Sequence, residues 1–244
     1  MQLRLCHGQP SCLACFIKSY HIFEKYGRIN RKYKKGGTGM EAVPCTAKTG
    51  KTDAAAPVWR KDGFVLRPAR QEDAERYYED NFAPLDPEIA RLTGCSSCFS
   101  KEEVTGFFKQ CVACPDRYDF VLVSPQGRIV GESVINEMDM QLRSANFRVA
   151  LFHPEACGKG TGSWMIRCTL EFAFQALRLH RLSLDVFSFN QRAIRAYEKA
   201  GFRREGVLRD AVLDGGAYAD DILMSMLEEE WRALYTARPA LPKE

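Results

Sequence analysis

The stretch that decides the fold runs from residue 157 to 163 and reads Cys157-Gly158-Lys159-Gly160-Thr161-Gly162-Ser163. It stands between a strand-like run, 147–152, and a long amphipathic run, 164–179. A strand, a glycine-rich turn and a helix in this order can hold a diphosphate, because glycines let the backbone come close and the N–H groups at the helix start point at the anion. Alone, such a turn is weak evidence, since many glycine-rich turns only connect elements.

A second informative stretch begins 28 residues after Gly162 and reads Asn190-Gln191-Arg192-Ala193-Ile194-Arg195-Ala196-Tyr197-Glu198-Lys199-Ala200-Gly201-Phe202. Together the two stretches resemble the acyl-CoA half of the GNAT family of N-acetyltransferases, and most closely its branch of spermidine and ribosomal-protein N-acetyltransferases. That family starts its main helix with Gln/Arg-x-x-Gly-x-Gly/Ala. Here the two glycines are kept and Cys157 replaces Gln/Arg, while the second motif is complete. The resemblance covers about residues 64–231 and is sharpest over 150–202.

The resemblance implies a fold and a reaction. The fold is α+β, with a mixed, mostly antiparallel central sheet and helices on both faces. The reaction moves an acetyl group from acetyl-CoA to a primary amine of a small molecule or a protein N-terminus, by direct transfer without a metal. Family positions that bind the cofactor correspond here to Ala150, Leu151, Phe152, Cys157, Gly158, Lys159, Gly160, Thr161, Gly162, Ser163, Asn190 and Lys199.

The replacement by Cys157 puts one diphosphate contact in doubt rather than the whole site. Main-chain N–H groups carry most of that contact in the family, and each favourable anion contact at a helix N-terminus contributes roughly 0.3–1 kcal/mol. We therefore expect weaker CoA binding, with Lys159 supplying compensating positive charge.

Two residues are candidates for catalysis. Tyr197 matches the family tyrosine that donates a proton to the leaving thiolate, although a packed aromatic beside Ile194 is the structural alternative. The leaving thiolate, whose thiol has a pKa near 8.5, can accept a proton from a tyrosine hydroxyl. Glu137, on a predicted strand at 128–138, resembles an acceptor-site carboxylate and is the candidate base, against the alternative of an exposed strand residue. Asn146 and Phe147 stand where polyamine enzymes have acidic residues, which weakens a polyamine acceptor.

The remaining elements follow from periodicity. Residues 74–82, 87–92 and 100–112 have helical spacing, and Ser100 with Glu103 fits a capping box. Strands are expected at 64–67, 119–124, 128–138, 147–152 and 182–186, with a hairpin of 203–213 and 218–227 around a Gly-Gly turn. Asn190 is a predicted N-cap, and Gly201 is predicted to end that helix in a left-handed cap.

The composition limits the classes of protein to which the chain can belong. The 244 residues, 45% hydrophobic and 27% charged, are typical of an ordinary globular protein. We expect an N-terminal extension over 1–60, the acetyltransferase domain over 61–232 and a tail over 233–244. Residues 1–39 carry eight basic residues against one acidic residue, so the overall charge of +4 leaves −3 for the remainder. A nucleic-acid partner would rest wholly on residues 1–39, so we expect none. No apolar run approaches the roughly 18 residues needed to span a bilayer, so we expect no membrane partner. Ten cysteines without an apparent secretory signal lead us to expect a cytoplasmic protein, and an oligomer is possible.

The N-terminal extension has its own interpretation. The codons for Lys35 to Met40 can contain a bacterial ribosome-binding sequence, so our hypothesis is that translation begins at Met40. A basic targeting arm or a disordered tail is the alternative.

Two further classes of function remain open. One is a non-catalytic regulator that binds acyl-CoA with the same fold. The other is a zinc or nucleic-acid binding protein, because Cys95-x2-Cys98 and Cys111-x2-Cys114 have zinc-like spacing. Cys111, however, falls on the apolar face of its predicted helix, where a buried thiol is ordinary. His153 and His180 lack ligand-like neighbours in the sequence.

Overall fold

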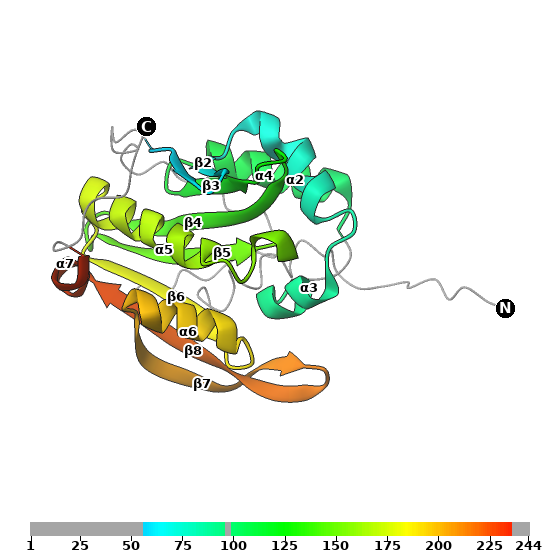
Figure 1. Ribbon diagram of the computed structural model, residues 1–244. Helices are drawn as coiled ribbons and strands as arrows, with labels where there is room; N and C mark the ends of the chain where they lie inside the picture. The colour runs from blue at the N-terminus through cyan, green and yellow to red at the C-terminus, as the bar shows by residue number, and fades with distance from the viewer. Residues whose placement is uncertain (1–55, 96–98, 236–244) are drawn as a thin grey trace, which may run out of the picture.

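One eight-stranded sheet forms the centre of the protein, with the strand order β1-β2-β3-β4-β5-β6-β8-β7 (Figure 1). The computed structural model describes residues 56–95 and 99–235. All neighbouring strands are antiparallel except β5 and β6, which run parallel. The strands are β1 (Trp59–Lys61), β2 (Phe64–Pro68), β3 (Tyr118–Val123), β4 (Ile129–Asp139), β5 (Ser144–Leu151), β6 (Arg181–Phe187), β7 (Arg203–Asp214) and β8 (Ala217–Leu227).

Helices cover both faces of this sheet (Figure 1). On one face, α2 (Ala74–Asn81) and α4 (Lys101–Ala113) pack near β4 and β3 after the short η2 (Gln71–Asp73), and α3 (Pro87–Thr93) joins the same hydrophobic cluster through Ala90. The opposite face carries α5 (Thr161–Glu171), which continues into the π-helical η4 (Phe172–Ala176), and α6 (Gln191–Ala200). The short η3 (Pro154–Ala156) precedes α5, and α7 (Glu228–Tyr235) follows β8. The α+β class and the mixed, mostly antiparallel sheet predicted from the sequence are confirmed.

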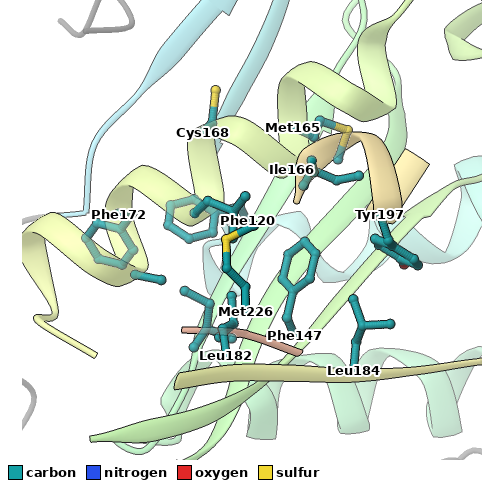
Figure 2. Packing of buried hydrophobic residues seen from close by; sticks show 14 of the residues in the cluster. Phe120, Phe147, Met165, Ile166, Cys168, Phe172, Leu182, Leu184, Tyr197 and Met226 are labelled. Atoms are coloured by element: carbon teal, nitrogen blue, oxygen red, sulfur yellow. The ribbon is translucent and has the colours of Figure 1, made fainter. Parts of the chain in front are cut away.

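The main core lies between the sheet and the α5–α6 layer (Figure 2). Phe120, Phe147, Leu182 and Met226 from four strands meet the α5 residues there, each at most 1% exposed. Burying one such side chain contributes about 1.5–3 kcal/mol, so this layer fixes α5 firmly on the sheet. Tyr197 lies at the edge of this core, in edge-to-face contact with the Phe147 ring at 6.3 Å.

The helix ends form as the sequence predicts. The capping box is complete, because the Ser100 hydroxyl accepts a hydrogen bond from the Glu103 N–H at 3.2 Å and the Glu103 carboxylate accepts one from the Ser100 N–H at 2.9 Å. The Asn190 side chain accepts a bond from the Ala193 N–H and starts α6. Gly201 ends α6 with φ of +103°, and a Cβ there would lie 2.4 Å from a methyl group of Leu234. That position therefore requires glycine.

Three expectations about the domain ends and core need correction. β1 begins at Trp59, inside the segment expected to precede the domain, and Trp59 is 1% exposed with its ring 5.4 Å from that of Phe120. Three residues of strand carry too little periodicity to be seen in the sequence. At the other end α7 continues to Tyr235, whose hydroxyl donates to the Ala200 carbonyl. The helical spacing of the run 164–179 places Ala176 on its apolar face with Phe172 and Ala173, but Ala176 is exposed at the end of the π-helical η4, where α-helical spacing no longer applies. Residues 1–55, including the region around Met40, lie outside the described residues.

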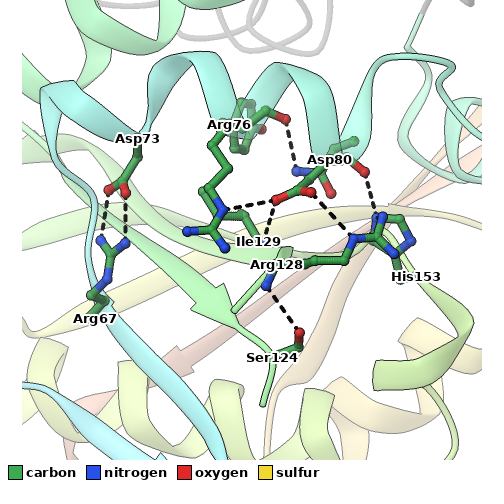
Figure 3. A network of polar contacts seen from close by, with 10 residues as sticks. Arg67, Asp73, Arg76, Asp80, Ser124, Arg128, Ile129 and His153 are labelled. Carbon is green, nitrogen blue, oxygen red and sulfur yellow. Dashed lines mark hydrogen bonds and ion pairs between the residues drawn. The ribbon is translucent and has the colours of Figure 1, made fainter. Parts of the chain in front are cut away.

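A polar network ties α2 to the strands beside it (Figure 3). The Asp80 carboxylate accepts a hydrogen bond from the Ile129 N–H at 2.8 Å and pairs with the side chains of Arg76 and Arg128. The imidazole of His153, just after β5, lies 2.7 Å from the Asp80 carbonyl. The α2 helix is thus fastened both to β4 and to the segment that leads into the glycine-rich turn.

Candidate active site

The strand pair β5–β6 separates part-way along its length. The two strands pair only at Ser144–Arg181, Ala145–Leu182 and Asn146–Ser183, whereas β4 stays paired with β5 up to Leu151. Beyond Asn146, therefore, one edge of β5 has no strand beside it. A cavity of about 450 Å³ lies at this split. An extended ligand can use the open edge of β5 as a further strand would.

The glycine-rich turn forms one end of the cavity. Gly158 and Gly160 have φ of +74° and +76°, a backbone conformation that side chains rarely adopt, and a Cβ on Gly158 would have no atom within 4 Å. Helix α5 begins after Gly160 without a side-chain cap. The first N–H groups of a helix have no partner within it, so this turn offers unobstructed donors to an anion. These features fit the diphosphate of acyl-CoA.

Positive side chains from α6 also line the cavity. Arg192, Arg195 and Lys199 all line the cavity. These cations could also supply the positive charge expected to compensate for Cys157; Lys159 is not among the residues that line the cavity, and its role stays a prediction. The sequence pattern that could have predicted this cluster of positive charge is the helical spacing of Arg192, Arg195 and Lys199 on one amphipathic helix.

Most of the predicted cofactor residues come together here. The cavity lining includes Ala150, Leu151, Phe152, Cys157, Gly158, Gly160, Gly162, Ser163, Asn190 and Lys199. Thr161 is buried at the helix start and, like Lys159, is not part of the lining. Their contacts with CoA stay predictions.

Tyr197 reaches the split from the α6 side and lines the cavity. Burial raises the pKa of Tyr197 above its usual range, and the negative charge of Asp185 adds to this effect, whereas Arg148 opposes it. The phenol therefore stays protonated at neutral pH. A protonated phenol at this position can donate a proton to a leaving group.

Polar and charged side chains line the cavity from the opposite face of the sheet, and we call this surface, formed by Tyr77, Glu132, Arg148 and Asp185, the floor of the cavity. The Tyr77 hydroxyl of α2 donates to the Glu132 carboxylate of β4 at 2.7 Å, and the Arg148 guanidinium of β5 donates to the other oxygen at 3.3 Å. All three residues line the cavity. Both Glu132 oxygens are therefore already engaged within the protein.

Asp185 on β6 is the functional candidate that the sequence motifs missed. Through the β5–β6 register it shares a face with Asn146 and Arg148, opposite the buried Leu184 and Val186. It lines the cavity, and burial raises the pKa of its carboxyl while Arg148 lowers it. The sequence pattern that could have indicated Asp185 is a charged residue within a predicted central strand, where charged side chains are rarely buried.

Glu137, the predicted base, lies outside the cavity lining, although it is among the charged groups near Asp185. It is exposed, has φ of +53° at a bulge of β4 and does not appear among the residues that line the cavity. A bulge turns a side chain away from the alternation expected of a strand. Its catalytic role stays an untested prediction, with less support than Asp185 now has.

The described cysteines are all free thiols. Burial raises the pKa of Cys111 to about 12, so this thiol is poorly suited to bind a metal. The described residues contain no group of three or more His, Cys, Asp or Glu side chains that could hold a metal, and Cys98 lies outside them. No described helix is long and apolar enough to cross a membrane.

Comparison with known proteins identifies the family. Residues 64–203 match the model of the acetyltransferase (GNAT) domain. The chain belongs to the GNAT family. A relative from Bacillus subtilis, the prophage-derived uncharacterized N-acetyltransferase YokL, is 35% identical over 178 residues, which cover 72% of this chain and 97% of the relative. The spermidine N(1)-acetyltransferase of Vibrio cholerae is 32% identical over 112 residues, 46% of this chain and 64% of that protein.

Solved GNAT structures share the fold. The spermidine N-acetyltransferase of Vibrio cholerae, in complex with CoA and spermine, superposes with a TM-score of 0.62 at 25% identity and covers 70% of this chain and 99% of its own. The ribosomal-protein-S5-alanine acetyltransferase of Vibrio fischeri gives 0.61 at 20% identity, covering 71% and 98%. This GNAT protein is accordingly an N-acetyltransferase, and the comparisons give no support to a non-catalytic regulator.

Proposed function

We propose that this GNAT enzyme transfers an acetyl group from acetyl-CoA directly to a primary amine of a small molecule. The observation that carries the proposal is the convergence of two groups at the β5–β6 split. The protonated Tyr197 approaches from the α6 side, and the Asp185 carboxylate lies on the opposite face of the sheet. The leaving group can thus interact with Tyr197 from one side, and the attacking amine can interact with Asp185 from the other.

The cofactor would lie along the open edge of β5, with its diphosphate at the turn of Gly158 and Gly160 and near Arg192 and Arg195. When bound, it supplies the activated acetyl group as a thioester. The main-chain groups of β5 orient it, and the α6 cations balance its phosphate charge.

The acceptor must first lose a proton, because an amine with a pKa near 10.4 requires about 4–5 kcal/mol for deprotonation at pH 7. The freed nitrogen then attacks the acetyl carbonyl, the N–C bond forms and the C–S bond breaks. The leaving sulfur takes the proton of the Tyr197 hydroxyl, and the remaining ammonium proton on nitrogen restores Tyr197. No covalent enzyme intermediate is needed.

The test is the variant Tyr197→Phe. We expect kcat to fall about a hundredfold, at the low end for a general acid, because a thiolate with a pKa near 8.5 is a good leaving group. Affinity for acetyl-CoA, measured by calorimetry, should stay within about twofold, because the aromatic ring still packs on Phe147. Wild-type turnover in the variant would remove the acid role from Tyr197.

A further inference from the structure

The acceptor side of the cavity has a wall without charges. From α2, α3 and the segment between and after them, the cavity is lined by Tyr77, Phe82, Leu85, Ile89, Leu92, Thr93 and Cys95. Phe152 and Phe187 continue this surface from the ends of β5 and β6. Within the described ranges, this segment places no Asp or Glu in the lining. A cation held against such a wall would lose its hydration without gaining a partner.

The floor beneath that wall carries a small net negative charge. Glu132 and Asp185 contribute two carboxylates and Arg148 one guanidinium, and all three line the cavity. Since Tyr77 and Arg148 already engage Glu132, the Asp185 carboxylate is the group left facing the cavity: in the described part of the chain it accepts no hydrogen bond from another side chain. One ammonium group would balance this floor, whereas a substrate carboxylate would meet surplus negative charge.

We propose that Asp185 binds the ammonium group of the acceptor and takes its proton, and that the acceptor is a monoamine whose apolar substituent packs against Leu85, Ile89 and Leu92. This rests on the proposed function and deepens it by naming the substrate class. The proton leaves the nitrogen for the Asp185 carboxylate and passes from there to solvent before the next turnover. The charged and titratable groups around Asp185 are Arg148 of β5, Glu132 and Glu137 of β4, Asp221 of β8 and Tyr197 of α6.

The substrate class is tested with a matched pair of amines. Hexylamine and hexamethylenediamine differ only by a second amine at the far end of the same chain. We expect kcat/KM for hexylamine to exceed that for the diamine at least tenfold, and calorimetry on the enzyme–CoA complex to rank the two amines the same way. Equal or reversed preference would overturn the proposed class.

The wall is tested by placing a charge on it. Leu92→Asp should reduce or reverse the preference for hexylamine, because the new carboxylate can pair with the second ammonium group. Leu142→Asp is the matched control, since Leu142 is 67% exposed, does not line the cavity and should keep the wild-type preference. If both variants behave like the wild type, the apolar substituent does not lie against α3.

The role of Asp185 is tested with Asp185→Asn, which keeps the shape of the side chain. We expect kcat/KM for hexylamine to fall about a hundredfold or more and the acid limb of its pH profile to vanish, while CoA affinity is retained. Glu137→Gln in the same assay decides between the two carboxylates: if it removes the acid limb and Asp185→Asn does not, the assignment is wrong. A wild-type enzyme that binds acetyl-CoA and both amines but transfers to neither would instead refute the proposed function.

Discussion

The two ends of the cavity are built from different groups. At the cofactor end, the fold offers the main chain: glycines with left-handed backbone, a helix start without a cap and an unpaired strand edge. At the acceptor end it offers side chains, with an apolar wall from α3 over a floor shared by Glu132, Arg148 and Asp185. Main-chain recognition suits a ligand common to a family, whereas side-chain recognition can change with each substrate. Perturbing one end should therefore leave the other unaffected.

The largest expected effect at the cofactor end comes from Gly158→Val. A β-branched residue in the left-handed region costs about 1–2 kcal/mol or forces the turn to rearrange, so the Kd for CoA should rise roughly tenfold. The matched control is Gly216→Val in the β7–β8 turn, where φ is +91° and a Cβ would also have no neighbour within 4 Å. Both variants should lose similar thermal stability, and only the first should lose CoA affinity. Equal CoA affinity in the two would mean that the turn does not hold the diphosphate.

A smaller effect is expected when Arg148 loses its charge. Because Arg148 lowers the pKa of Asp185, Arg148→Gln should raise that pKa. More of the carboxyl is then protonated at acidic pH, so kcat/KM should fall several-fold there and recover as the pH rises through the new pKa. Arg148→Lys keeps the positive charge and should leave the acid limb near its original position. A limb that moves equally in both variants would point to the loss of the Glu132 contact instead of charge.

The smallest effect concerns the attachment of α3. The Arg91 guanidinium donates to both oxygens of Asp214 at 2.6 and 2.8 Å and lies 4.7 Å from the centre of the Phe189 ring, so it holds α3 to the β7–β8 turn. An exposed ion pair contributes at most about 1 kcal/mol, and Arg91→Ala should raise the acceptor KM about two- to fivefold without changing CoA affinity. Arg204→Ala removes the similarly exposed pair with Glu198 and should change neither constant.

This difference between the two ends also explains what could be predicted from the sequence. The glycine turn and the Asn190 motif are local, so short spacings were enough to predict β5, α5 and α6 and to name residues most of which line one cavity. The acceptor floor joins Tyr77, Glu132, Arg148 and Asp185 from four elements, and only the strand register brings them together. The position of Glu137 relative to the cavity could not be predicted, because alternation along β4 fails at a bulge that has no recognisable residue pattern.

The short β5–β6 pairing has a mechanical consequence. Among the residues that the structure describes, three residue pairs form the ladder that joins β1–β5 to β6, β8 and β7, whereas β6 and β8 pair over seven positions. We therefore expect the two parts of the sheet to move relative to each other about this short ladder, restrained by the α5–α6 layer that packs against the sheet. An acetyl-CoA molecule bound along the open edge of β5 would occupy the gap between β5 and β6 and restrict this movement. Binding of acetyl-CoA would then stiffen the region in which Tyr197 and Asp185 line the cavity from opposite faces of the sheet.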